Sequence, residues 1–69
     1  MTIYDALSQA AKREGWTPTK IAATVGKTEA AARRWLNGSA EMTASDYHLL
    51  RRVIPGFAEL ADRCIVEAA

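Results

Sequence analysis

Apolar residues recur along the chain at helical spacing, and glycine or proline divides them into five segments. The last segment, from Phe57 to about Val66, has apolar residues at positions i, i+3, i+4, i+7 and i+8. This spacing places them on one face of an amphipathic helix. No window alternates apolar and polar residues with the period of two that marks a strand. The pattern therefore predicts an all-α fold with five helices.

Threonines and glycines set the expected helix ends. A hydroxyl side chain commonly begins a helix, and glycine commonly ends one. Asp5, three residues after Thr2, gives the first helix the spacing of a capping box, and Pro18 occupies the first position of the second helix. The expected N-caps are Thr2, Thr17, Thr28 and either Thr43 or Ser45. The expected stops are Gly15, Gly26, Gly38 and residues 54–56.

The length and composition fit one small domain, expected to span residues 1–69. Fourteen residues are Ala, the best helix former, whereas four are Gly and two are Pro. A chain of this size buries only about 60% of its unfolded surface, so a large catalytic cleft is not expected. The length also leaves no room for a separate ligand-binding or oligomerisation domain, so no small-molecule ligand is expected.

The cysteine and histidine content argues against several function classes. The single cysteine, Cys64, excludes a disulfide within the chain and fits a reducing compartment. His48 and Cys64 alone do not make a zinc site, and no nucleophile–base pair has catalytic spacing. No apolar run approaches the ~20 residues of a membrane span, and no signal pattern is present. We therefore expect a cytoplasmic protein with no metal, no cofactor and no enzyme activity.

Residues 17–37 have the spacing of a helix-turn-helix, in which Gly26-Lys27-Thr28 joins two short helices. Gly26 can adopt the positive φ that the turn requires, and the small Ala22 allows the helices to approach closely. The positions that must face the core are all apolar: Ile21, Val25, Ala32 and Trp35. A generic helical hairpin is the alternative, but it would not require this combination.

The segment from Trp16 to Gly38, which ends in Arg33-Arg34-Trp35-Leu36-Asn37-Gly38, resembles the core of the lambda-repressor-like (Cro/XRE-type) DNA-binding family over 23 residues without a gap. The resemblance implies a compact five-helix lambda-repressor-like domain, in which residues 28–37 form the recognition helix. It also implies a regulator similar to stand-alone phage, prophage or plasmid proteins, acting in a bacterial or phage-infected cell close to the nucleoid. Lys27 and Glu29 differ from the residues usual in the family, so the resemblance does not specify which DNA sequence is bound.

Basic residues concentrate in the half of the chain that holds the motif. Residues 1–38 contain six Lys or Arg against three Asp or Glu, whereas residues 39–69 contain three against five. The net charge of +1 would not by itself indicate a nucleic-acid partner. The asymmetry, however, favours DNA contact by the first half.

The exposed side of the recognition helix carries small residues and two arginines, which suits a major groove about 12 Å wide. Arg34 is the expected base reader, because a guanidinium pairs with guanine O6 and N7 and because the matching family position has that role. The expected base contacts are Thr28, Glu29, Ala30, Arg33 and Arg34. Helix N-termini favour phosphate, and with the family pattern the expected contacts to the DNA backbone are Thr17, Thr19, Lys20, Lys27, Asn37 and Ser39.

These residues also have purely structural interpretations. Glu29 and Arg33, four residues apart, can form an exposed ion pair, in which Glu29 orients Arg33 instead of accepting a hydrogen bond from cytosine N4. A role as helix cap would by itself explain Thr28, and a role at the helix C-terminus would by itself explain Asn37, without any contact to DNA. Trp16 and Trp35 are expected in the core, with stacking on single-stranded nucleic acid as the alternative.

The leading hypothesis is a sequence-specific transcriptional repressor that binds double-stranded DNA at a palindromic operator as a homodimer. By the resemblance, the outer side of the C-terminal helix (residues 56–66) meets a two-fold mate, and inward packing in a monomer is the alternative. The second hypothesis is a helix-turn-helix-fold module whose arginine face binds a protein, as in a phage-encoded inhibitor or adaptor. The expected dimer residues are Phe57, Leu60, Ala61, Cys64 and Ile65.

Overall fold

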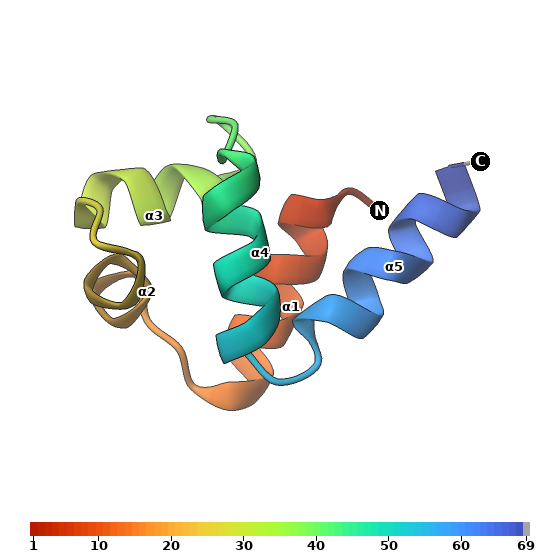
Figure 1. Cartoon of the computed structure of the whole chain (residues 1–69), viewed down its shortest axis with the longest axis horizontal. Coiled ribbons are helices and arrows are strands. Elements are labelled where there is room, and N and C mark those ends of the chain that lie inside the picture. The colour runs from red at the N-terminus through yellow and green to blue at the C-terminus, as the bar shows by residue number, and fades with distance from the viewer. Residues whose placement is uncertain (69) are drawn as a thin grey trace.

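The structure, a computed structural model, describes the backbone of residues 1–68 and the side chains of residues 1–65. These residues form five helices and no strands (Figure 1). The expected all-α fold is confirmed, and the last residue of the expected domain, residue 69, lies outside the described residues. The helices are α1 (Ile3–Glu14), α2 (Pro18–Val25), α3 (Glu29–Asn37), α4 (Ala44–Val53) and α5 (Phe57–Ala68).

Threonine hydroxyls begin the first four helices, as the sequence predicts. Each accepts a hydrogen bond from the backbone N–H three residues later, at 3.1–3.2 Å. At α1 the Asp5 carboxylate also accepts from the Thr2 N–H at 2.9 Å, which completes the capping box. Thr43, not Ser45, caps α4. The helix starts are therefore determined locally by side chains that satisfy otherwise unpaired N–H groups.

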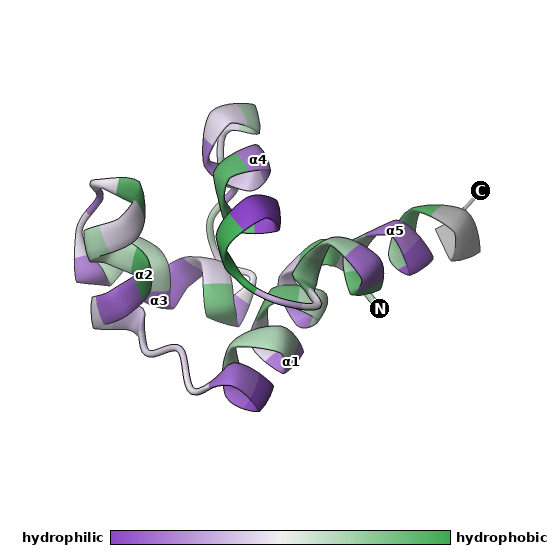
Figure 2. Ribbon diagram, turned by 60° about the horizontal axis from the view of Figure 1, so that its bottom comes forward, coloured by the Kyte–Doolittle hydropathy of each residue, from purple (hydrophilic) through white to green (hydrophobic). Residues whose placement is uncertain are grey.

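Helix α1 lies at the centre of the molecule. It packs extensively against α5 on one side and α3 on the other, while α2 is held mainly by α3 and more weakly by α4. The face of α1 that is buried consists of Ala6, Leu7, Ala10 and Ala11. Each helix carries both hydrophobic and hydrophilic residues (Figure 2), so every helix depends on its neighbours for burial.

One continuous core joins the five helices. The largest fully buried side chains are Phe57, Leu7, Ile21, Leu50 and Ile54, and Ala32 and Trp35 contribute from α3. Val25, Leu36 and Trp16, all expected to face inward, are half-buried and pack against this core. The core therefore includes the residues that the helix-turn-helix pattern placed inside, with Val25 at its edge.

The apolar stripe of α5 is divided between the core and the surface. Phe57, Ala61 and Cys64 are 0–5% exposed within the single chain, so the expectation that they face a second protomer is corrected. They are buried because α5 packs against α1, whose own apolar face needs a partner. Of the expected dimer residues, Leu60 is half-buried, and Ile65 is exposed.

A polar cluster ties α4 to α5. The Arg51 guanidinium donates to both carboxylate oxygens of Asp62, at 2.7 and 3.4 Å, and to the Tyr47 hydroxyl at 3.1 Å. The hydrogen bonds from Arg51 hold the pKa of the Asp62 carboxyl below its ordinary value. The Tyr47 ring packs edge-on against buried Phe57, so the cluster is continuous with the core.

Replacing Trp35 with Ala is expected to destabilise the fold by about 3–5 kcal/mol, because removal of the large indole leaves a cavity between packed helices. That loss is a large part of the roughly 5–15 kcal/mol that stabilises a typical domain. Urea unfolding followed by circular dichroism measures it. Arg34→Ala, an exposed change on the same helix, is the control and should leave the midpoint nearly unchanged. A midpoint for Trp35→Ala equal to that of the control would contradict the assignment of Trp35 to the core.

The Arg51–Asp62 pair is expected to make stability depend on pH in the acid range. The pKa of Asp62 is lower in the folded state, so the pair stabilises the fold above the unfolded pKa, and this contribution is lost as the pH falls through the folded pKa. The stability difference between wild type and Asp62→Asn should therefore be present at pH 7 and shrink as the pH is lowered to 3.

Urea midpoints at several pH values test this. Glu41→Gln is the control, since Glu41 makes no ion pair among the side chains that the structure describes. A gap between wild type and Asp62→Asn that stayed constant down to pH 3 would show that the ion pair adds no pH-dependent stability.

Candidate nucleic-acid interface

Helices α2 and α3, with the turn at residues 26–28, form the expected helix-turn-helix unit. Figure 1 shows α2 nearly end-on while α3 lies across the view, so the two helices cross steeply. The chain turns between them at Gly26, whose φ is +71°, a conformation that strains residues with a side chain. The Lys27 N–H donates to the Ala22 carbonyl at 3.0 Å and closes the end of α2. The local sequence therefore fixes where α2 ends.

Helix α3 has two distinct faces. Ala32 and Trp35 are 0% and 4% exposed and anchor the helix in the core. The exposed residues are Ala30, Arg33, Arg34 and Asn37. Their i, i+3, i+4, i+7 spacing places them on one side of the helix. A helix is about 10–12 Å across with its side chains, so this face has the dimensions of a major-groove reader.

Three side chains connect α2 to this face. The Thr19 hydroxyl on α2 donates to Oε2 of Glu29 at 3.0 Å. The other carboxylate oxygen of Glu29, Oε1, accepts from Nη2 of Arg33. The predicted Glu29–Arg33 pair is thus present. Thr19, expected to face phosphate, instead bonds Glu29.

The N-terminus of α2 lies beside this network. The Thr17 hydroxyl is the cap of α2, accepting from the Lys20 N–H at 3.2 Å. The Lys20 ammonium stands 4.4 Å from the centre of the Trp16 ring. The half-buried Trp16 ring therefore has a cation on its face, where a base would have to stack. Lys20 itself remains exposed at the helix N-terminus, where the dipole also favours anions.

The remaining candidates lie at the two ends of α3. Thr28 and Lys27 are exposed at its start, and the Thr28 hydroxyl caps the helix by accepting from the Ala31 N–H at 3.1 Å. Asn37 and Ser39 are exposed at its end. The Ser39 hydroxyl donates to the Arg34 carbonyl at 3.4 Å. The structure therefore brings the candidate DNA contacts onto the start of α2, onto α3 and onto the chain segments that flank α3.

The contact between Thr19 and Glu29 is the feature that sequence reasoning missed. The residues are ten positions apart on different helices, so no helical spacing indicates it. Glu29 departs from the usual residue of the resembled family, which was the available signal that this position does something different.

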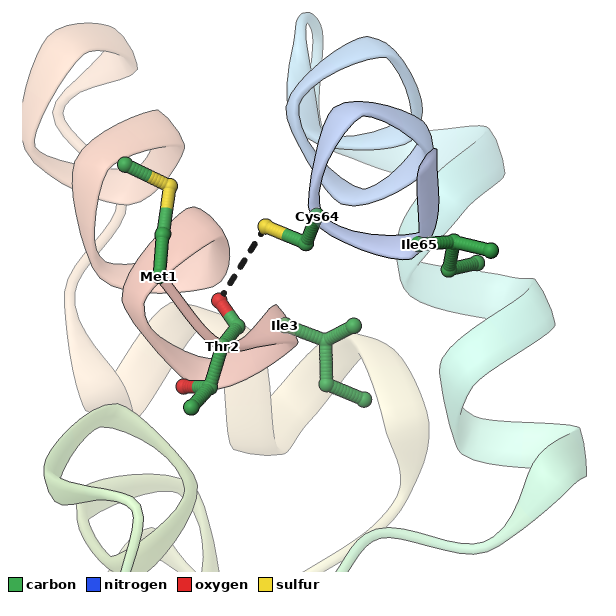
Figure 3. Close-up of a pocket in the computed structure, with 5 residues that line it drawn as sticks. All are labelled: Met1, Thr2, Ile3, Cys64 and Ile65. Atoms are coloured by element: carbon green, nitrogen blue, oxygen red, sulfur yellow. Dashed lines mark hydrogen bonds between the residues drawn. The ribbon is translucent and has the colours of Figure 1, made fainter. Parts of the chain in front are cut away.

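A second surface lies where the start of α1 meets α5. Met1 and Ile65 are the large hydrophobic side chains most exposed among those described, at 61% and 56%. Both line a surface cavity of about 270 Å³ together with Thr2, Ile3 and Cys64. Figure 3 shows the Cys64 thiol turned inward, where it donates to the Thr2 carbonyl at 3.4 Å, whereas Ile65 points away. This surface is apolar, unlike the exposed face of α3.

The described residues also bear on other kinds of functional site. Among them, no three His, Cys, Asp or Glu side chains gather where they could hold a metal ion. In the same part of the chain, no helix is long and apolar enough to cross a membrane. His48 is exposed on α4, beside the Tyr47 ring.

Comparison of the chain with models of protein families, with curated proteins and with solved structures found no match.

Proposed function

We propose that this protein is a sequence-specific DNA-binding regulator that inserts α3 into the major groove. The observation that carries the proposal is the exposed face of α3, formed by Ala30, Arg33, Arg34 and Asn37 on a helix anchored from behind by Trp35. Small and basic side chains on a protruding helix face let the backbone approach the bases, while the arginines reach their edges. Repression at an inverted repeat is the simplest outcome of such binding.

The positions of the basic side chains also support DNA binding by this face. Arg34 forms no ion pair among the described side chains, so its guanidinium is available to guanine O6 and N7. Lys20 is exposed in the first turn of α2, and Lys27 is exposed in the turn before α3. Both can meet phosphates beside the groove. A protein partner for this face is the competing possibility, and salt dependence separates the two, because DNA binding releases counterions.

A homodimer is the assembly that we propose on DNA. The apolar surface with Met1 and Ile65 is formed by the start of α1 and by α5, and it includes no residue of α3. Two protomers joined there can leave the exposed face of each α3 free. Two recognition helices must lie about 34 Å apart to enter successive major grooves.

Replacing Arg34 with Ala is expected to cost about 1–3 kcal/mol on the preferred site and to relax preference at one base pair, because a bidentate base contact is lost. Lys20→Ala should instead weaken binding to all sequences similarly and reduce the salt slope by roughly one unit. The preferred site is first selected from random duplex DNA, and mobility shifts at several salt concentrations give the affinities.

Lys12→Ala is the matched control, since it removes one exposed positive charge from the last turn of α1. It should leave both preference and the salt slope close to wild type. If Arg34→Ala bound the selected site as tightly as wild type, Arg34 would not be a base reader. If wild type selected no sequence and showed no salt-dependent binding, the face would be assigned to a protein partner.

Ile65→Glu is expected to reduce the protein bound per full operator from two protomers to one, because burying an unpaired carboxylate in an apolar interface costs several kcal/mol. Sedimentation of protein with a labelled operator, at saturating protein, counts the protomers. Ser45→Glu adds the same charge at an exposed site on α4 and should retain two. One wild-type protomer per full operator would refute the two-fold assembly.

A further inference from the structure

The Thr19–Glu29–Arg33 network has a feature that a simple surface ion pair lacks. An exposed pair at i, i+4 within one helix is common and weakly stabilising. Here the carboxylate is also held by a hydroxyl from a second helix, 3.0 Å away. Glu29 is thus fixed at two points, one on α2 and one on α3. The orientation of Arg33 is therefore coupled to the packing of α2 against α3.

We infer that Thr19 and Glu29 are positioning residues that hold the Arg33 guanidinium for a guanine edge, which makes Arg33 a determinant of specificity; this rests on the DNA-binding function proposed above. Thr19 acts only through Glu29, since its bond is to the carboxylate. Glu29 acts on Arg33 through Nη2. A guanidinium has five N–H donors, so those not used by Glu29 remain for the base.

The hydrogen bonds argue against direct DNA contact by Glu29. Both of its carboxylate oxygens already accept a hydrogen bond within the protein. Turning the carboxylate toward a cytosine amino group would release both Thr19 and Arg33. The side chain is also less exposed than that of Arg33, 41% against 63%. Glu29 is therefore less accessible than Arg33 on this face and is occupied by bonds within the protein.

The arrangement favours binding through entropy. A free arginine loses rotamer freedom when it is fixed against a base. An arginine already restrained by a carboxylate loses less, and such preorganisation raises affinity for the correct site. Arg34 forms no such pair among the described side chains. The two neighbouring arginines therefore differ: Arg33 is held in place, and Arg34 is not.

The first test needs no DNA. Relaxation of the side-chain Nε–Hε groups measures arginine mobility on the nanosecond timescale. In Thr19→Val, Arg33 should become more mobile while Arg34 stays unchanged, and Thr19→Ser, which keeps the hydroxyl, should behave as wild type. Unchanged Arg33 mobility in a folded Thr19→Val protein would refute the network.

The second test uses a double-mutant cycle on the sequence selected from random duplex DNA. Thr19→Val should weaken binding to this site about 2- to 10-fold, the range expected for restoring the freedom of one side chain. The loss should fall on the base pair at which Arg33→Ala also loses preference, and binding to random DNA should not change. In an Arg33→Ala background, Thr19→Val should have no further effect.

Three other outcomes would contradict either the inference or the proposed function. If Thr19→Val weakened all sequences equally, with or without Arg33, Thr19 would be a phosphate contact and the inference would be wrong. If Glu29→Ala altered preference at a base pair other than that of Arg33→Ala, Glu29 would be a base reader and the inference would again be wrong. If selection enriched no sequence, the proposed function would fail, and with it the role of Arg33 in specificity. The mobility measurement would then decide separately whether the network restrains Arg33.

Discussion

The close packing of α3 and α5 against α1 is the constraint on which the rest of the structure depends. The buried face of α1 is built mostly from alanines, with Leu7 as its one large side chain. A methyl group allows two helices to approach near the lower end of the usual 8–10 Å axial distance. Because α1 packs against both α3 and α5, bulkier residues on its buried face would push away the helices that cover it.

This packing also decides which parts of α5 remain at the surface. Phe57 and Ala61 fill the core, and the Cys64 thiol donates to backbone carbonyls of Leu60 and Thr2. Asp62 is held by Arg51 of α4, which fixes how α5 lies on its neighbours. Ile65, at the next position round the helix from Cys64, is then left outside with Met1. Among the described side chains, this amphipathic helix thus buries most of its apolar stripe in the core and leaves Ile65 exposed.

Local features of the fold could be predicted from the sequence, and features that depend on two elements could not. Helix starts at Thr2, Thr17 and Thr28 follow from hydroxyls placed three residues before an unpaired N–H. The inward positions of α3 follow from helical spacing. The expectation that Phe57, Ala61 and Cys64 face a second protomer was wrong, because periodicity shows that a helix face is apolar but not what covers it.

The same limit explains what was found and what was missed at the candidate interface. The pairing of Glu29 with Arg33 lies within one helix and follows from their spacing. The bond from Thr19 depends on how two helices cross, which is set by the packing of residues such as Ile21 and Ala32. Knowledge of both helix positions is required before such a contact can be seen.

The two faces of α3 separate stability from the proposed recognition of DNA. The inner face, with Ala32 and Trp35, is buried and cannot change without loss of packing. Polar contacts on the outer face add little to folding, since exposed ion pairs are typically worth about 0–1 kcal/mol. The physical effect of Glu29 on the outer face is therefore mainly to restrict where Arg33 can lie. Substitutions at Thr19 or Glu29 can then alter the proposed recognition of DNA while the fold, held from the inner face, is retained.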